Sequence, residues 1–369
     1  MIVAIVLCAV FATIYQCGRG RHRFPHPHLS PIRQAIYANF PDPAIIEHEG
    51  MWYAFATNNA AGILKMPTNQ SSYEFGSSNV QIATSKDYAN WTLMDSLHDP
   101  LPTLGAWVTN QMSDTHPPVP KANVWAPEIL QRPDDGKFIM YYSAAAKNAT
   151  GSHCIGAAIS DSGPAGPYTA LDGPIVCPVH VGGAIDPVSF VDVDGTMYIA
   201  WKIDGNNAGH GGICGNTVPP LVDTPIRISR LKADGVTLDG EPISIMDREK
   251  GDGPLVEAPS LIRTDDGFYF LFFSSGCTRA PSYDVKYAWA KNVTGPYTRG
   301  NYPLLKSGDF GLSSPGSIGM RRSSSGQVQM AFHARITTHF GRVRAMYTTR
   351  LQFNGTSVAL GDPIPVVST

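Results

Sequence analysis

A short sequence unit that recurs five times constrains the fold of this 369-residue chain more than any other feature. In each copy, a small or acidic residue lies close to a proline, and an apolar pair, a turn and an aromatic-rich strand follow. The copies begin at Asp42, Ala126, Asp186, Glu257 and Ser314. A second pair of strands is predicted after each copy, at 81–94, 155–171, 226–245, 285–305 and 345–360. Each unit therefore supplies about four strands, as one propeller blade does.

A four-stranded blade cannot bury both of its faces alone. Arranged radially, five blades bury their faces against each other and leave only short edges. The high content of glycine and proline and the low content of charged residues also suit short strands joined by tight turns. The repeats predict an all-β fold, a five-bladed β-propeller with a central pocket, as one domain over residues 21–369.

Three stretches interrupt the repeat, at 60–77, 109–122 and 206–222, and they are rich in Gly, Pro, Asn and Thr. Insertions in propellers concentrate in the loops around the mouth of the central channel, where binding residues also lie. We expect these stretches to cover one face of the molecule and to shape the specificity of the pocket.

The first residues of the chain indicate secretion. The apolar run from Ile2 to Tyr15 is too short to span a bilayer comfortably, so residues 1–20 are interpreted as a signal peptide; a membrane anchor is the alternative. Five Asn-x-Ser/Thr sequons add support, at Asn69, Asn90, Asn148, Asn292 and Asn354. We expect a secreted, extracellular glycoprotein that is free of the membrane in its mature form.

Four cysteines lie beyond the leader and are the candidates for disulfides. They are Cys154, Cys177, Cys214 and Cys277, an even set whose spacings match no zinc motif. Four cysteines allow three pairings, and the shortest loops favour Cys154 with Cys177 and Cys214 with Cys277. The alternative is that some of them are free and buried.

The charge balance limits the classes of partner. The formal net charge is −2, and no cluster of Lys and Arg interleaves with aromatic residues. A nucleic-acid partner therefore has no electrostatic footprint, and a neutral carbohydrate fits better. We expect a monomer that needs no cofactor.

Three carboxylates open their repeat units beside a proline: Asp42, Asp186 and Glu257. Since the first strands of all units surround one axis, the repeat predicts that these side chains meet in one cavity. Each alone is also compatible with a turn cap or a solvated edge residue. Glu128 follows its proline instead of preceding it, so alternation directs it elsewhere and we do not assign it to catalysis.

Four segments together resemble glycoside hydrolase family 43. They are Phe40-Pro41-Asp42-Pro43, Trp125-Ala126-Pro127-Glu128, Ala184-Ile185-Asp186-Pro187 and Val256-Glu257-Ala258-Pro259. The resemblance implies a five-bladed propeller with a deep pocket and hydrolysis with inversion. It assigns Asp42 as general base, Glu257 as general acid, and Asp186 as the carboxylate that raises the pKa of the acid and orients it.

Further residues are candidates for binding. Trp125 is expected to stack on a sugar ring, with a core aromatic as the alternative. Arg279 and Arg335 are candidates for contacts with substrate hydroxyls. His333 resembles a histidine of the family that contacts a central metal or water. In the absence of an Asp-rich calcium loop, a structural calcium ion would be held mainly by water around His333.

The resemblance leaves the substrate open among arabinose- and xylose-containing plant polysaccharides. The leading hypothesis is an α-L-arabinofuranosidase or a β-xylosidase, and an endo-arabinanase with the same three carboxylates is a close variant. A carbohydrate-binding propeller without catalysis is the alternative of another class. The intact carboxylates argue against that alternative.

Overall fold

The protein is described from a computed structural model, which describes residues 30–57, 63–64, 73–74, 78–94, 98–109, 111–112, 120–121, 124–149, 151–336 and 343–364. The predicted signal peptide and the sequon at Asn69 lie outside these residues, as do most of the predicted loops at 60–77 and 109–122. Across the described part of the chain, no helix has the length and apolar character needed to cross a membrane.

Five antiparallel sheets, here called blades I to V, follow one another along the chain. Blade I contains β2 (Ala44–His48), β3 (Met51–Thr57), β6 (Val80–Ser85) and β7 (Thr92–Leu93). Blade II contains β10 (Val124–Gln131), β11 (Phe138–Ala145), β12 (His153–Ser160) and β13 (Thr169–Ala170). Blade III contains β14 (Ala184–Val191), β15 (Met197–Ile203), β16 (Ile226–Leu231) and β17 (Leu238–Met246).

The last two blades follow the same order. Blade IV contains β18 (Val256–Arg263), β19 (Tyr269–Ser275), β20 (Asp284–Ala290) and β21 (Thr298–Arg299). Blade V contains β22 (Gly316–Arg322), β23 (Val328–Arg335) and β24 (Arg344–Asn354), and two strands pair with its outer strand β24: β25 (Ser357–Leu360) and β1 (Arg33–Ile36). The strand β1 from the start of the described chain thus completes the last blade.

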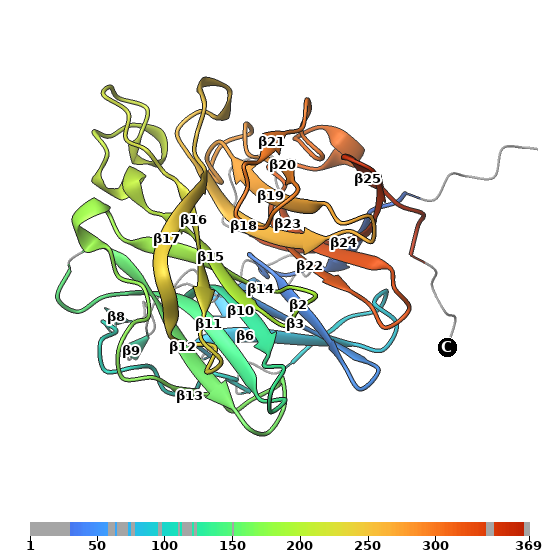
Figure 1. Cartoon of the computed structure of the whole chain (residues 1–369), viewed down its shortest axis with the longest axis horizontal. Coiled ribbons are helices and arrows are strands. Elements are labelled where there is room, and N and C mark those ends of the chain that lie inside the picture. Colours follow the sequence, from blue (N-terminus) through green and yellow to red (C-terminus); the bar gives the residue numbers. More distant parts are fainter. Residues whose placement is uncertain are drawn as a thin grey trace, which may run out of the picture.

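The blades form a closed ring. The innermost strands contact each other in the circular order β2, β10, β14, β18, β22 and back to β2, and they lie toward the middle of the molecule in Figure 1. Each gap between neighbouring blades is filled by its own cluster of buried apolar side chains, five clusters in all among the described residues. The predicted five-bladed propeller and its five pairs of hairpins are therefore confirmed.

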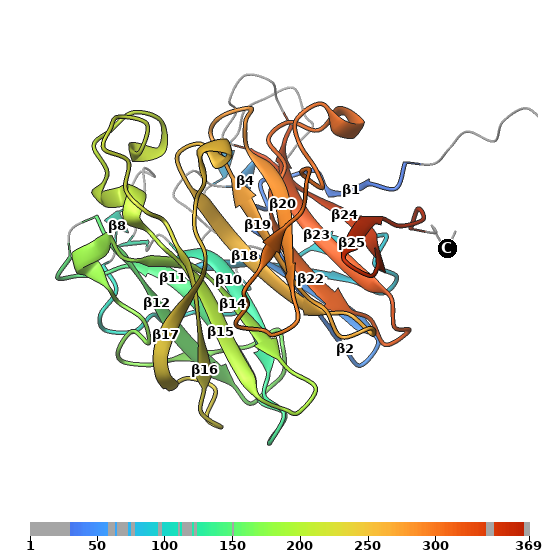
Figure 2. The ribbon, with the colours of Figure 1, turned by 45° about the horizontal axis from the view of Figure 1, so that its top comes forward.

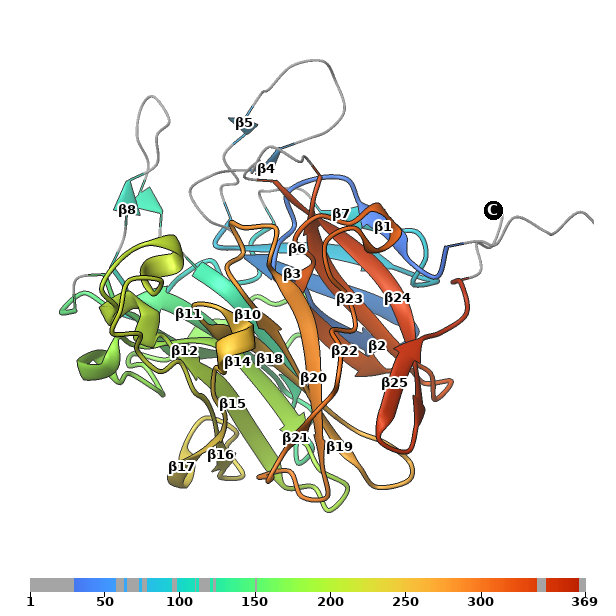
Figure 3. The same cartoon turned by 90° about the horizontal axis from the view of Figure 1, so that it is seen from above.

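Short elements extend the connections between blades. Two small hairpins, β4 (Ile63–Leu64) with β5 (Tyr73–Glu74) and β8 (Gln111–Met112) with β9 (Pro120–Lys121), protrude from the blades in Figure 3. The predicted insertion at 206–222 carries two short 3₁₀ turns, η2 (Gly205–Ala208) and η3 (Ile213–Gly215). Together with η1 (Val179–Val181), they lie on the same side of the molecule as β8 in Figure 2.

Two disulfides connect the four cysteines in the pairing that the shortest loops favoured. Cys154 on β12 is bonded to Cys177 within blade II. Cys214 in the insertion of blade III is bonded to Cys277, which follows β19 in blade IV. The second disulfide thus joins two neighbouring blades.

A left-handed residue marks the start of every blade. Its φ angle is between 42° and 57° in all five, at Asp42, Ala126, Asp186, Ala258 and Ser317. Non-glycine residues avoid this region because Cβ crowds the backbone, so the surrounding structure must hold these residues in place. In blades II to V the residue lies within a register shift of the innermost strand. Four of the five left-handed residues directly precede a proline. Residues before proline usually adopt an extended conformation, and these four do not.

The backbone N–H of each left-handed residue donates across to the preceding blade, and we call these five bonds the inter-blade latch. The acceptor is a side chain near the end of the second strand in four of them. Ala126 donates to Thr57 Oγ1 at 2.7 Å. Asp186 donates to Ser143 Oγ at 3.0 Å, and Ser317 to Ser274 Oγ at 2.9 Å. Asp42 donates to His333 Nδ1 at 3.2 Å, which closes the ring between blades V and I.

One ion pair crosses the channel between blades that are not neighbours. Glu128 on β10 accepts from Arg321 of β22 at 3.0 Å and from Ser189 Oγ of β14 at 2.7 Å. Burial raises the pKa of Glu128 despite the Arg321 guanidinium. Glu128 lines the same narrow central cavity as Asp42 and Asp186, so the expectation that alternation directs it elsewhere is wrong, and its ion pair with Arg321 gives it a structural use there.

Removing Arg321 should destabilise the propeller. In Arg321→Ala, Glu128 keeps a buried charge without its cation, and the expected loss is about 3 kcal/mol in the free energy of unfolding measured with urea. The double variant Arg321→Met/Glu128→Gln should recover most of this loss, since no charge stays buried. Equal losses in both variants would show that the ion pair is not the cause.

Candidate active site

Asp42 lies in a fully hydrogen-bonded, cationic environment. Its Oδ1 accepts from Arg344 at 2.9 Å, and its Oδ2 accepts from Thr57 Oγ1 at 2.6 Å. Nδ1 of His333 lies 3.2 Å from Oδ1. Burial alone would raise the pKa of Asp42, but Arg344, His333 and Thr57 together hold it well below its ordinary value. Asp42 is therefore ionised throughout the neutral range, as a base must be.

Asp186 lies in the opposite electrostatic environment. Its Oδ2 accepts the backbone N–H of Ala258 at 2.9 Å. Burial and the charge of Glu257 raise the pKa of Asp186 to about 8, although the Lys202 ammonium opposes this rise. Asp186 therefore holds a proton at neutral pH, and we call Asp186 and the neighbouring Glu257 together the dyad.

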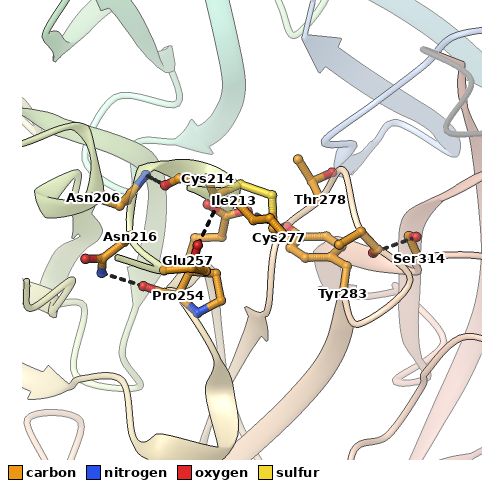
Figure 4. The surroundings of a disulfide bond; sticks show 12 residues. Asn206, Ile213, Cys214, Asn216, Pro254, Glu257, Cys277, Thr278, Tyr283 and Ser314 are labelled. Atoms are coloured by element: carbon orange, nitrogen blue, oxygen red, sulfur yellow. Dashed lines mark hydrogen bonds between the residues drawn. A yellow bond between two sulfur atoms is a disulfide. The ribbon is translucent and has the colours of Figure 1, made fainter. Parts of the chain in front are cut away.

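Glu257 is held at both carboxylate oxygens. Lys202 on β15 donates to Oε2 at 3.1 Å, and Tyr283 donates to Oε1 at 2.8 Å. Figure 4 shows Glu257 and Tyr283 beside the disulfide between Cys214 and Cys277. The inter-blade disulfide thus lies next to this carboxylate.

The three predicted carboxylates are close together, but they are not in one register. Asp42 and Asp186 are the left-handed residues of their blades, and both line the narrow central cavity. In blade IV the equivalent position is Ala258, and Glu257 precedes it by one residue. The expectation that all three occupy equivalent positions is therefore wrong for Glu257. The reason is an offset in the sequence: Asp42 and Asp186 directly precede the proline of their unit, whereas Glu257 precedes Pro259 by two residues.

Trp125 has the position in blade II that Glu257 has in blade IV. Trp125 pairs with Ser143 as Glu257 pairs with Ser274, and each directly precedes the left-handed residue. Trp125 is half-buried, and one ring face stacks on His153 with centroids 3.7 Å apart. Burial lowers the pKa of His153 to about 4, so its ring is neutral above that pH. The indole thus has one face packed against a neutral imidazole.

His333 is fully buried on β23, and its ring stacks on Tyr283. Burial, together with Arg344, lowers the pKa of His333 to about 4. Its Nε2 is buried and has no hydrogen-bond partner in the part of the chain that the structure describes. Because Nδ1 accepts the backbone N–H of Asp42, the neutral ring carries its proton on Nε2, which can donate to a water molecule and cannot bind a cation directly. Over the same residues, no group of three or more His, Cys, Asp or Glu could hold a metal, and the calcium ion expected near His333 stays a prediction.

The two predicted arginines differ in their surroundings. Arg335 at the end of β23 is buried, and its Nε donates to the carbonyl of Thr278 at 2.8 Å. Burial and the nearby Arg344 lower the pKa of Arg335 to about 10. Arg279 is exposed in the loop after β19. Arg279 is thus the more exposed of the two, and both stay predictions as substrate contacts.

Sequence reasoning missed four residues whose side chains donate to the carboxylates: Arg344, Lys202, Tyr283 and Thr57. Lys202 had a signal, since it is a charged residue within the apolar strand Met197–Ile203. Arg344 begins β24 and lies 302 residues from Asp42 in the sequence, so the repeat does not relate them. Nothing in the sequence around Tyr283 indicates a contact with Glu257.

The chain is similar to known proteins in sequence and in structure. A model of glycosyl hydrolases family 43 matches residues 32–356. An extracellular endo-α-(1→5)-L-arabinanase of Thermotoga petrophila is 28% identical over 275 residues, which are 69% of this chain and 50% of that protein. An extracellular exo-α-(1→5)-L-arabinofuranosidase of Cellvibrio japonicus is 26% identical and is matched over 69% of this chain and 65% of its own length.

The fold has close counterparts among solved structures. The crystal structure of a thermostable family-43 glycoside hydrolase superposes with a TM-score of 0.66 at 24% identity, covering 90% of this chain and 96% of that chain. The chain thus spans nearly the whole of this solved structure but only half of the Thermotoga petrophila protein.

The raised pKa of Asp186 should make this residue costly for stability. Its stabilising contribution is complete below the pKa of about 4 of an unfolded Asp, and it is lost as the pH rises through about 8. We expect the free energy of unfolding of Asp186→Asn to be about 2 kcal/mol higher than that of the wild type at pH 8, and nearly equal to it at pH 4.5. The difference at pH 8 is no larger because Asp186 keeps some exposure to the channel. Urea unfolding at both pH values measures this difference. A difference that does not change with pH would contradict the assignment.

Proposed function

The chain belongs to glycosyl hydrolases family 43, and on this premise we propose that it hydrolyses α-L-arabinofuranosyl linkages of plant polysaccharide with inversion. The single observation that carries the proposal is the electrostatic split within one site. Asp42 is held ionised by Arg344, while the dyad of Asp186 and Glu257 holds a proton. Carboxyl groups whose pKa values are pushed apart in one cavity are the expected arrangement for an acid and a base.

In the proposed reaction, Asp42 accepts a proton from a water molecule whose oxygen attacks the anomeric carbon. Glu257 delivers the proton of the dyad to the glycosidic oxygen as its bond to that carbon breaks. Asp186 keeps the proton available at neutral pH because its own ionisation is disfavoured. Arg344 and Thr57 fix the base, and Tyr283 and Lys202 fix the acid.

The sugar is proposed from the names of the relatives. Two relatives act by name on α-(1→5)-linked arabinan, one within the chain and one from an end. Arabinan is therefore the first substrate to test, and xylan-derived substrates come second. Both relatives are also extracellular by name, and two disulfides suit an oxidising compartment, which supports secretion.

Variants of the proposed acid and base should lose activity. Asp42→Asn and Glu257→Gln are each expected to lower kcat on linear arabinan by about 10²- to 10⁴-fold. Reducing-end assays measure the rate, and proton NMR of the first product reports whether the anomeric configuration inverts. Glu128→Gln is the matched control, since this buried carboxylate serves the ion pair with Arg321, and its kcat should stay near wild type. If no sugar of an arabinan, arabinoxylan, galactofuranoside and xylo-oligosaccharide panel is cleaved, the proposal fails.

Trp125 should contribute to binding and not to chemistry. Its half-buried ring is expected to stack on a sugar of the polymer, so Trp125→Ala should raise KM for arabinan about three- to tenfold with little change in kcat. Trp125→Phe keeps an aromatic ring, so its KM should lie between that of the wild type and that of Trp125→Ala. A large fall in kcat with unchanged KM would place Trp125 in the proton-transfer machinery instead.

A further inference from the structure

One blade departs from the inter-blade latch. In four blades, the side chain that faces the left-handed residue of the next blade is Thr57, Ser143, Ser274 or His333, and each accepts the backbone N–H. The equivalent position in blade III is Lys202, which pairs with Ile185 as Ser143 pairs with Trp125. A lysine ammonium cannot accept a hydrogen bond.

The latch in this blade is made by another group. The backbone N–H of Ala258 donates to Asp186 Oδ2 at 2.9 Å, so a carboxylate takes the place of the missing hydroxyl. The ammonium of Lys202 is directed to Glu257 Oε2 and Asp204 Oδ1, each at 3.1 Å. With lysine in place of a hydroxyl residue at this position, Asp186 accepts the N–H of Ala258 and Glu257 accepts from the ammonium of Lys202.

Lys202 is more deeply buried than its chemistry would normally allow. Its side chain is 1% exposed, and an ammonium in such a place needs close anionic partners. The charged groups around it are the carboxylates of Asp204, Glu257 and Asp186. Their charges raise the pKa of Lys202 in spite of its burial, so it is a permanent cation.

We propose that Lys202 is a positioning residue for proton transfer: its ammonium fixes the carboxyl group of Glu257 and sets the charge balance of the dyad. This inference rests on the proposed roles of Asp186 and Glu257. Two bonds from different blades, from Lys202 and from Tyr283, hold the two oxygens of Glu257 and so fix the plane of its carboxyl group. A positioned acid is worth far more than a mobile one, because misplacement of about 1 Å costs around 10²-fold in rate.

The charge of Lys202 also sets the upper pH limit of activity. The groups that act on Asp186 are Glu257 and Asp42, which disfavour its ionisation, and Lys202, which favours it. Without Lys202 the pKa of Asp186 rises above about 8, so the dyad keeps its proton to higher pH. The basic limb of the pH profile, where the acid loses its proton, then moves upward. The acidic limb depends on Asp42, whose partners are Arg344, His333 and Thr57, and it stays in place.

The test compares three variants of the full chain. Lys202→Met removes the charge, Lys202→Ser restores a latch hydroxyl without charge, and Lys202→Arg keeps the charge. For each variant, kcat/KM on the substrate that the wild type cleaves is measured from pH 4 to pH 10, with linear α-1,5-arabinan as the first choice. Lys286→Met is the matched control, since Lys286 pairs with Asp252 and not with the candidate carboxylates.

Lys202→Met and Lys202→Ser should lower kcat about ten- to hundredfold with KM changed less than about threefold. Both should move the basic limb upward by about one pH unit or more. Lys202→Arg and Lys286→Met should keep the basic limb of the wild type. If Lys202→Met does not fold, Lys202→Met/Asp204→Asn removes the opposing charge as well, and the same shift is expected.

A folded uncharged variant with an unmoved basic limb would overturn the proposal, even if its kcat or its Tm fell. An upward shift in Lys202→Arg would do so too, since the charge is kept. These results differ from a failure of the proposed function, in which the wild type itself cleaves no sugar of the panel or Asp42→Asn and Glu257→Gln remain active.

Discussion

The fold depends on a backbone hydrogen bond made at the start of each blade, around the central channel. A residue in the left-handed region turns its N–H toward the preceding blade, where a hydroxyl, an imidazole nitrogen or a carboxylate accepts it. Blade packing alone is apolar and nondirectional, and it does not fix the rotation of one sheet against the next. The latch fixes that rotation at the radius where the candidate catalytic residues lie.

The same constraint explains why the site is located there. Two of the five left-handed residues are Asp42 and Asp186, so the strained backbone that closes the ring also directs two carboxylates into the channel. Strained residues persist only where neighbouring structure determines them, and here five apolar clusters between blades supply that structure. Closure of the propeller and placement of Asp42 and Asp186 in the channel therefore depend on the same backbone conformation.

The buried charges around the channel are arranged in pairs with different consequences. Arg344 balances Asp42 and leaves it ionised, whereas one ammonium, Lys202, is shared among several carboxylates. The unequal supply of cations is what separates the pKa of Asp42 from that of Asp186. Several buried carboxylates that share one ammonium lower the stability of a protein. The same arrangement keeps one carboxyl group protonated at neutral pH, as a general acid requires.

The sequence by itself determined the blade count, the position of the hairpins and the three carboxylates that lie near one another, and it favoured the observed disulfide pairing among three. These follow from local periodicity, turn residues and short loops, and such signals are written into contiguous residues. The tertiary structure showed that Ala258, and not Glu257, is equivalent to Asp42, since Ala258 is the left-handed residue of its blade; the position of Glu257 two residues before its proline was already present in the sequence. The tertiary structure also decided which cation meets which carboxylate. Arg344 reaches Asp42 from the other end of the chain and Lys202 reaches Glu257 from the neighbouring blade, and only closure of the ring brings such distant residues within hydrogen-bond distance.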